Sequence, residues 1–229
     1  RLESIAAVGA SYTYFDRDGN AVFTIGPFDL ALPAGKIHFI VGGNGSGKST
    51  LFKALTGLYA ANAGELRVDG VVVGRRNLAA YRELISVIFS DFHLFTKLYG
   101  LLDVDEAEGR RLLELMQLTD KTRLVDGAFS NRRLSTGQRK RLAMVVALLE
   151  DRPVYAFDEW AADQDPEFRQ YFYDELIPAL TARGKIVIAI SHDDRYFRCA
   201  DQILTLDYGR VRSLERMRER PSPEDSIRA

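Results

Sequence analysis

The sequence predicts an α/β fold in which an antiparallel β subdomain comes first and a parallel sheet with a helical insertion follows. Two patterns predict it. Apolar and polar residues alternate near the N-terminus, whereas short, wholly apolar runs recur later with helical stretches between them. Strands that face solvent on one side alternate, and parallel strands buried on both faces are apolar throughout. The succession of the two patterns therefore indicates strands first and an α/β core after them.

The expected elements follow from these patterns in chain order. Residues 10–15 and 21–25 alternate on either side of a turn-forming run and predict a hairpin, with a third strand at 28–32. The later elements are expected to be a buried strand at 36–41, a helix at 49–58, a hairpin at 65–73, a helical subdomain at about 91–149, a strand at 154–157, a helix at 167–183 and a strand at 186–190.

Composition sets broad limits on the class of protein. The chain has 229 residues, of which 28% are charged, and its formal net charge is -1. It therefore lacks the basic excess of a nucleic-acid-binding protein, and nucleic acid is not an expected partner. No apolar run approaches the ~20 residues that span a bilayer. Cys199 is the single cysteine, so it forms no intramolecular disulfide and is expected to pack in the core.

The folded domain is expected to span residues 1–214. Residues 215–229 are charged and broken by proline, so this tail is expected to be disordered. Because the chain begins at Arg1 without methionine, we expect it to be a domain excised from a longer polypeptide.

A glycine-rich loop between the strand at 36–41 and the helix at 49–58 predicts a phosphate site. It matches the pattern G-x-x-x-x-G-K-[ST] and comprises Gly42, Gly43, Asn44, Gly45, Ser46, Gly47, Lys48, Ser49 and Thr50. Glycines let successive N–H groups turn toward phosphate oxygens, and the following helix directs its positive end at the same anion. Lys48 is then expected to reach the β- and γ-phosphates of a nucleotide, and the Ser49 hydroxyl to bind Mg²⁺. A phosphate loop alone leaves kinases, GTPases, helicases and others open.

Two carboxylates end the apolar strand at 154–157. Asp158 is expected to hold Mg²⁺, directly or through water, at the carboxyl end of the sheet. Glu159 is expected to act as general base on the attacking water. Paired carboxylates at a strand end are often only a solvated turn, but the phosphate loop upstream favours this Walker B interpretation.

The run Leu134-Ser135-Thr136-Gly137-Gln138 narrows the family. Ser135 and the N–H groups of Thr136 and Gly137 open a helix and make a second anion site. Placed between the phosphate loop and the Walker B strand, the run resembles the signature of ABC transporter ATP-binding domains, which usually have glycine where Thr136 stands. The resemblance covers residues 2–214. It implies a P-loop NTPase core with an N-terminal antiparallel β subdomain and an inserted helical subdomain that carries the signature.

Further residues are in register with that family. The resemblance implies that Ser135, Thr136, Gly137 and Gln138 contact ATP, that Asp165 belongs to the D-loop at the same nucleotide, and that His192 contacts the γ-phosphate and positions the attacking water. It also implies that Tyr14 stacks on adenine, with Tyr12 and Phe15 as alternatives. His38 and His93 have no such context and are expected to be structural.

One position departs from the family pattern. The family usually has a glutamine that touches Mg²⁺ and the attacking water, and Ser90 stands at that position. Serine is too short to make the same contacts without a bridging water. The adjacent Asp91 is therefore a candidate Mg²⁺ ligand, because carboxylate oxygens suit this ion.

The segments 90–92, 158–166 and 191–197 resemble one branch, the bacterial exporters of cyclic peptides and siderophore precursors, including pyoverdine- and microcin-type systems. This resemblance implies an ATPase that powers export at the cytoplasmic face of the inner membrane. It implies two partners: a transmembrane domain fused N-terminally, and a second copy that sandwiches ATP head to tail. Residues 92–102 either receive a coupling helix of the transmembrane domain or belong to the core.

Three alternatives from other functional classes differ from this sequence in recognisable features. A DNA-repair ABC ATPase needs a long coiled coil between the phosphate loop and the signature, and none is present. A translation-associated ABC ATPase carries two cassettes and a basic arm, whereas this sequence has one cassette and a net charge of -1. A non-catalytic or non-transport cassette acting as a regulatory binding module would lack Glu159 or His192, but Ser90 keeps this alternative open.

Overall fold

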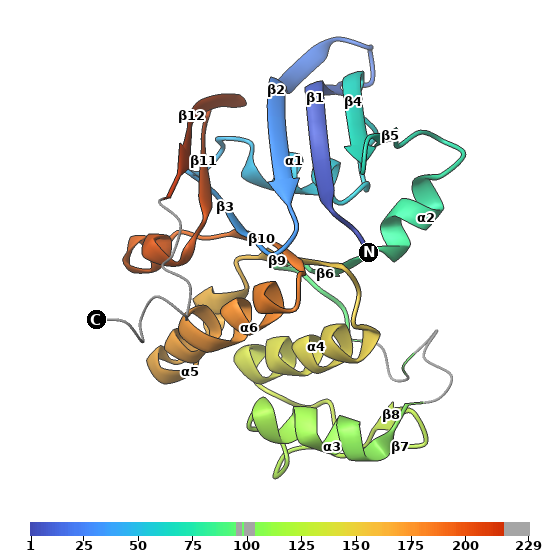
Figure 1. The fold of residues 1–229 in the computed structure, drawn as a ribbon, viewed down its shortest axis with the longest axis vertical. Helices are drawn as coiled ribbons and strands as arrows, with labels where there is room; N and C mark the ends of the chain where they lie inside the picture. Colours follow the sequence, from blue (N-terminus) through green and yellow to red (C-terminus); the bar gives the residue numbers. More distant parts are fainter. Residues whose placement is uncertain (95–97, 99–103, 218–229) are drawn as a thin grey trace, which may run out of the picture.

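The computed structural model describes residues 1–94, 98 and 104–217. Figure 1 shows an antiparallel sheet beside a mostly parallel sheet, with helices covering the latter's other face. The antiparallel sheet has the order β2-β1-β4-β5 and comprises β1 (Ser4–Phe15), β2 (Ala21–Pro33), β4 (Ala63–Val68) and β5 (Val71–Val72). The second sheet has the order β12-β11-β3-β10-β9-β6 and comprises β3 (Ile37–Gly42), β6 (Ile85–Ile88), β9 (Val154–Asp158), β10 (Ile186–Ile190), β11 (Gln202–Asp207) and β12 (Arg210–Arg216).

The helices lie on both sides of this second sheet and in the insertion. They are α1 (Lys48–Leu55), α2 (Leu78–Glu83), α3 (Glu106–Leu115), α4 (Thr136–Glu150), α5 (Pro166–Tyr171) and α6 (Ile177–Ala182). Shorter elements are the hairpin β7 (Leu124–Val125) and β8 (Ala128–Phe129), the 3-10 turns η1 (Trp160–Asp163) and η3 (Asp194–Cys199), and the π-helical turn η2 (Phe172–Leu176). No helix in the described part of the chain is long and apolar enough to span a membrane.

The central strands β3, β9 and β10 place the candidate site. Every residue of β9 and β10 is buried, and so is β3 up to its last residue. The three strands run parallel, with β10 between β3 and β9. Parallel strands end at the same edge, so the residues that follow β3, β9 and β10 in sequence meet there.

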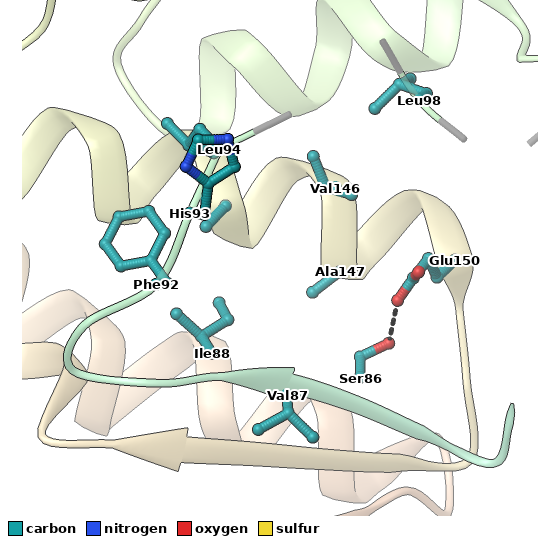
Figure 2. Close-up of a pocket in the computed structure, with 11 residues that line it drawn as sticks. Ser86, Val87, Ile88, Phe92, His93, Leu94, Leu98, Val146, Ala147 and Glu150 are labelled. Atoms are coloured by element: carbon teal, nitrogen blue, oxygen red, sulfur yellow. Dashed lines mark hydrogen bonds between the residues drawn. The ribbon is translucent and has the colours of Figure 1, made fainter. Parts of the chain in front are cut away.

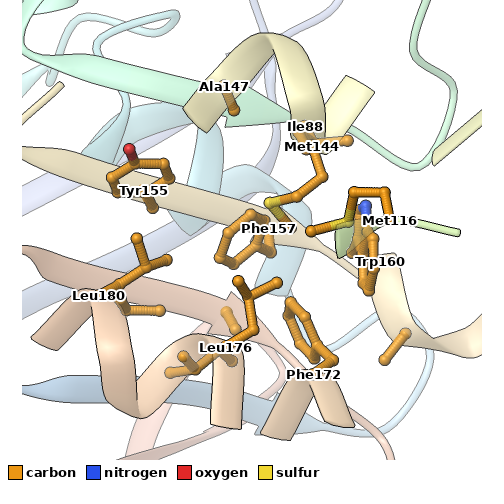
Figure 3. Packing of buried hydrophobic residues seen from close by; sticks show 14 of the residues in the cluster. Ile88, Met116, Met144, Ala147, Tyr155, Phe157, Trp160, Phe172, Leu176 and Leu180 are labelled. Atoms are coloured by element: carbon orange, nitrogen blue, oxygen red, sulfur yellow. The ribbon is translucent and has the colours of Figure 1, made fainter. Parts of the chain in front are cut away.

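Two hydrophobic clusters hold the layers together. One lies between the antiparallel sheet, α1 and the parallel sheet. The other lies on the opposite face, where Phe157, Trp160 and Phe172 pack with Met116 and Met144 (Figure 3). The Trp160 and Phe172 rings stack at 4.4 Å between centroids. Helix α4 therefore packs directly against the strand and turn that carry the paired carboxylates.

Most of the predicted elements are confirmed, and two predictions are wrong. The expected third strand at 28–32 is the continuation of β2, because pairing with β1 shifts register near Gly26 and resumes without ending. The region 91–149 is not helical throughout: residues 92–94 belong to no helix or strand, and the β7–β8 hairpin separates α3 from α4. A bulge, and a hairpin whose strands have only two residues each, leave little periodic pattern of apolar residues in a sequence.

The end of the domain lies slightly beyond the expected residue 214. Strand β12 pairs with β11 up to Arg216, and the Met217 N–H donates to the Asp201 carbonyl at 2.9 Å. The first residues of the expected disordered tail are therefore part of the sheet. The rest of that prediction, residues 218–229, lies outside the described residues.

His38 and Cys199 occupy structural positions. His38 is 3% exposed on β3, and its Nδ1 lies 2.8 Å from Gln202 Oε1 on β11. Its Nε2 lies 3.3 Å from the Pro33 carbonyl oxygen. Cys199 is buried in the cluster that contains Trp160. Both side chains agree with the structural roles expected for them.

The burial of His38 predicts an acid-sensitive contribution to stability. Burial lowers the pKa of the His38 imidazole below 6.5, so the unfolded chain binds this proton at a higher pH than the folded chain. The free energy of unfolding is therefore expected to fall by up to about 1.4 kcal/mol per pH unit as pH drops below 6.5 toward the folded pKa. Urea titrations of the parent chain and His38→Gln at pH 7.5, 6.5 and 5.5 measure the difference. Equal pH slopes in the two proteins would contradict this assignment.

Candidate active site

The phosphate loop curves between the end of β3 and the start of α1. Gly47 precedes α1 with φ 102°, and a Cβ there would lie 2.8 Å from Ile25 Cγ2, so both backbone and space require glycine. The Gly209 N–H donates to the Ser46 carbonyl at 2.8 Å, so the β11–β12 turn braces the loop. A cavity of about 510 Å³ opens over it. The cavity is lined by Phe23, Asn44, Gly45, Gly47, Lys48, Ser49, Thr50 and Glu159.

The polar atoms of the loop fit a phosphate ligand. Lys48 Nζ donates to the carbonyl oxygens of Gly42 and Gly43, each at 2.9 Å, which holds the ammonium at the loop. Burial lowers the pKa of Lys48, and the carboxylates of Glu159 and Asp158 act in the opposite direction. Within the described residues, Ser46 Oγ is buried without a hydrogen-bond partner. An orphaned hydroxyl beside loop N–H groups and a helix N-terminus is suited to an anion.

Asp158 ends β9 and is 5% exposed. Its Oδ2 accepts a hydrogen bond from Ser90 Oγ at 3.1 Å, a contact that joins the ends of neighbouring strands β9 and β6. The structure thus ties Ser90 to the Asp158 carboxylate, whereas Asp91 is exposed. The described residues contain no group of three or more His, Cys, Asp or Glu side chains able to hold a metal. Ser49 and Asp158 offer hard oxygen donors, which fit a Mg²⁺ ion that keeps several waters.

Glu159 and His192 meet at the carboxyl edge of the sheet. His192 Nε2 lies 2.7 Å from Glu159 Oε1, and the two residues follow the neighbouring strands β9 and β10. Both side chains are partly exposed, and Glu159 also lines the cavity over the phosphate loop. The Glu159 backbone is left-handed, with φ 50° and ψ 36°, which costs about 1–2 kcal/mol in a residue with a Cβ. Such strain at a cavity is typical of functional positions.

The signature residues form the capped start of α4. Ser135 Oγ accepts from the Gln138 N–H at 3.3 Å, and Gln138 Oε1 accepts from the Ser135 N–H at 3.1 Å. This reciprocal capping box leaves the N–H groups of Thr136 and Gly137 at the helix start. Ser135 and Thr136 are exposed, and none of the signature residues lines the cavity over the phosphate loop. The start of α4 and the phosphate loop are therefore separate sites in one copy of the chain.

The signature helix is joined to the turn at 159–165. A Cβ on Gly137 would lie 2.5 Å from the Asp163 carbonyl oxygen, so the two backbones approach closely. Arg141 donates to Gln164 Oε1 at 2.8 Å and to the Asp165 carboxylate. Asp165 also caps α5 by accepting the Phe168 N–H at 2.9 Å, and this bond, followed by the Arg141 charge, lowers the pKa of Asp165. The structure thus gives Asp165 a role within its own chain.

Tyr14 lies in an aromatic cluster on the β1–β2 hairpin. Its ring meets Tyr12 edge-on at 4.9 Å and Tyr59 edge-on at 5.6 Å, and its hydroxyl is 3.5 Å from Thr50 Oγ1 at the start of α1. Tyr12 instead stacks on Tyr59 at 4.7 Å. Of the three aromatic candidates, Tyr14 therefore contacts the phosphate-loop helix, through Thr50.

Sequence reasoning missed several residues of the site. Phe23 lines the cavity over the phosphate loop and is the cross-strand partner of Tyr14 in the β1–β2 register. The hairpin prediction gave a signal for it, because the residue opposite Tyr14 had to lie on the second strand. The contacts of Ser90 and Arg141 join residues 68 and 24 positions apart, and no local pattern reveals them.

The comparisons with known proteins agree with this geometry. A family model described as ABC transporter matches residues 25–162. ATP-binding protein SyrD of Pseudomonas syringae pv. syringae is 46% identical over 213 residues, which cover 90% of this chain and 37% of SyrD. An ATP-dependent lipid A-core flippase of Aliivibrio fischeri is 32% identical over 217 residues, which cover 88% of this chain and 36% of the flippase.

Solved structures share the fold. A bacterial Atm1-family ABC exporter with ATP bound has a TM-score of 0.75 at 24% identity, over 94% of this chain and 39% of the exporter chain. The ATP-binding cassette MJ0796, in a dimeric post-hydrolysis state with ADP and Pi, has a TM-score of 0.78 at 23% identity, over 94% of this chain and 100% of that chain. The present chain spans roughly a third of the length of SyrD and the flippase.

The predicted α/β cassette is thereby confirmed, with its phosphate loop, Walker B strand and signature helix in one fold. The chain belongs to the ABC transporter family, of which it is an ATP-binding ATPase domain.

Proposed function

We propose that this domain hydrolyses ATP through Glu159 and His192 and thereby powers export of a cyclic peptide or siderophore precursor across the bacterial inner membrane. The observation that carries the proposal is the 2.7 Å contact between the two side chains, at the edge of the cavity over the phosphate loop. A carboxylate beside a positioned imidazole, facing a phosphate site, suits activation of a water molecule.

The phosphate loop supplies binding and charge stabilisation. Loop N–H groups, the start of α1 and the Lys48 ammonium would hold the phosphates of ATP. Ser49 and Asp158 would hold Mg²⁺, with Ser90 orienting the Asp158 carboxylate and Asp91 as a further proposed ligand. The ion, when bound, neutralises charge on the phosphate oxygens. Tyr14 would stack on adenine, and Phe23 is placed to contact the nucleotide at the same cavity.

Glu159 would take the proton of the attacking water. His192 Nε2 lies 2.7 Å from Glu159 Oε1, so its N–H would donate to the carboxylate and fix its direction. The imidazole would then lie near the γ-phosphate of bound ATP. Glu159 directly follows strand β9 and has a left-handed backbone conformation, so the proposed base is held close to the end of a buried strand.

A second copy would complete the site. Ser135 and Thr136 are exposed at the start of α4 and lie outside the cavity of their own chain. Head-to-tail pairing would place the signature residues and Asp165 of each copy at the nucleotide of the other, in a two-fold arrangement. The dimeric form of the MJ0796 cassette supports this assembly.

A transmembrane domain is the second proposed partner, which would place the chain at the cytoplasmic face of the inner membrane. A pocket of about 270 Å³ lies between β6 and α4. Phe92, Leu94, Val146 and Ala147 are among the residues that line it, as Figure 2 shows. Phe92 is half-buried and packs against the core, which supports the core role expected for this part of the region at 92–102. Contact with a coupling helix is the role proposed here. Phe95 and Tyr99 lie outside the described residues. The pocket is suited to an apolar coupling helix.

The substrate class rests on the segments that resemble cyclic-peptide and siderophore exporters, and on the 46% identity to SyrD. The alternative function is a non-catalytic cassette that acts as a regulatory binding module. Ser90 in place of glutamine favours the alternative, whereas the Glu159–His192 contact favours catalysis.

Glu159→Gln is expected to bind ATP and to lose at least about a hundredfold in hydrolysis rate, because a positioned general base contributes about 10²–10⁴-fold. Sedimentation with ATP and Mg²⁺ is expected to show a dimer that is absent without nucleotide. Glu175→Gln makes the same charge change at an exposed position of η2 and is the control. Parental turnover in Glu159→Gln would reject the general base. An inactive, monomeric parent chain, still inactive together with its transmembrane domain, would favour the regulatory module.

Ser90→Ala and Asp91→Ala separate two ways of holding Mg²⁺. Because Ser90 Oγ donates to Asp158, Ser90→Ala is expected to raise the Mg²⁺ concentration for half-maximal ATPase by about tenfold. A similar increase in Asp91→Ala would support a direct ligand at that position. An Asp91→Ala variant with unchanged Mg²⁺ dependence would reject Asp91 as a ligand, and an unchanged Ser90→Ala would reject the orienting bond.

A further inference from the structure

Lys140 has a side chain that the proposed chemistry leaves unused. It lies on α4, two residues after Gln138, and is 1% exposed, among the largest fully buried side chains of the described chain. A buried ammonium needs acceptors, because an unpaired charge in the interior is strongly unfavourable. The partners of Lys140 therefore indicate why a lysine stands there instead of an apolar residue.

Those partners all belong to the turn that starts with the proposed general base. Lys140 Nζ donates to the backbone carbonyl of Glu159 at 2.9 Å and pairs with Asp163 Oδ2 at 2.7 Å. In return, Trp160 Nε1 donates to the Lys140 carbonyl at 2.9 Å. Trp160 is itself fixed by stacking on Phe172 (Figure 3). Helix α4 thus donates a hydrogen bond to the turn 159–163 and accepts one from it.

The bond to the Glu159 carbonyl fixes the peptide that sets the direction of the Glu159 side chain. Glu159 is left-handed, an unfavourable conformation that persists only when its surroundings impose it. The same carbonyl accepts the Ala162 N–H at the longer distance of 3.3 Å, so the ammonium is the closer of its two partners. Holding this carbonyl in place holds the Glu159 carboxylate where it meets His192.

The same lysine connects the base to the signature residues. Ser135 caps α4, and Lys140 lies one to two turns further along the same helix. A helix moves as a rigid element over so short a distance, so a shift of its start at the nucleotide of a second copy displaces the Lys140 ammonium as well. The position of Glu159 then depends on whether the signature end of α4 is engaged.

We propose that Lys140 is a positioning residue that fixes Glu159 for hydrolysis and makes its position depend on the helix that carries the signature residues. The inference rests on the proposed role of Glu159 as general base. Asp163 balances the buried charge and so keeps the ammonium at the Glu159 carbonyl.

Lys140→Met removes the charge and the donor while keeping a side chain of similar length. Lys140→Arg keeps a cationic donor and tests rescue. Lys185→Met is the matched control, because Lys185 Nζ likewise donates to a carbonyl and pairs with a carboxylate, both of Asp151, at 2.7 and 2.9 Å. Its side chain is 12% exposed and precedes β10, at the sheet edge opposite the site.

NMR spectra of the 229-residue chain contain the imidazole signals of only three histidines, so the His192 signal is readily followed. Because His192 contacts Glu159, its signal reports on the position of Glu159 without requiring turnover. The His192 signal of Lys140→Met is expected to move toward its position in Glu159→Ala, while the His38 signal stays in place. ATPase kcat is expected to fall about tenfold, as for a misplaced catalytic group, with the KM for ATP unchanged. Lys140→Arg is expected to recover part of both changes. Lys185→Met is expected to lower the melting temperature alone.

A parental His192 signal and parental kcat in Lys140→Met would overturn the inference. If that variant does not fold, Asp163→Asn decides instead: its side chain is 46% exposed, and the change removes the counter-charge that holds the ammonium beside the Glu159 carbonyl. An unchanged His192 signal in Asp163→Asn then overturns the inference. Failure of the proposed function is distinguishable, because it appears as turnover retained in Glu159→Gln. An inactive Glu159→Gln beside a normal Lys140→Met rejects the positioning role alone.

Discussion

The parallel pairing of β3, β10 and β9 is the constraint on which the rest of the structure depends. These strands are buried on both faces, so their backbone groups must pair with one another, and the pairing brings their carboxyl ends to one edge. The phosphate loop, the paired carboxylates and His192 each follow one of the three strands. Residues more than a hundred positions apart in sequence therefore share one cavity edge, although none of them pairs with another in the sheet.

A chain with a net charge of -1 must hold a polyanion by local means. Loop N–H groups, the start of α1 and one lysine supply this, and the nearby carboxylates keep partners of their own: Ser90 for Asp158 and His192 for Glu159. Each carboxylate is thereby oriented before any ligand arrives. Preorganised groups of this kind need little rearrangement during reaction, which is where they stabilise a transition state most.

The contact between α4 and the turn 159–165 links the signature residues to the turn that begins with Glu159. Gly137 touches the Asp163 backbone, Arg141 holds Asp165, and Lys140 reaches the Glu159 carbonyl. The signature helix and the proposed base are therefore neighbours in one chain, while Ser135 and Thr136 stay exposed. This arrangement explains how one copy is able to respond to nucleotide held mainly by another, in the ATP-sandwich dimer proposed above.

The sequence by itself determined the family and the order of the motifs, and it named Glu159 and His192 as candidates, because each motif is a short run of residue types that serve one chemical use together. It placed Glu159 and His192 at strand ends, yet their 2.7 Å contact, the Ser90–Asp158 bond and the burial of Lys140 were decided by the tertiary structure. The sequence pattern also predicted two strands where the structure has the single strand β2. A bulge interrupts the alternation of apolar and polar residues there without ending the pairing with β1. The physical reason is the same in each case: propensity and motif act over a few neighbouring residues, whereas these contacts join residues brought together only by the packing of distant strands and helices.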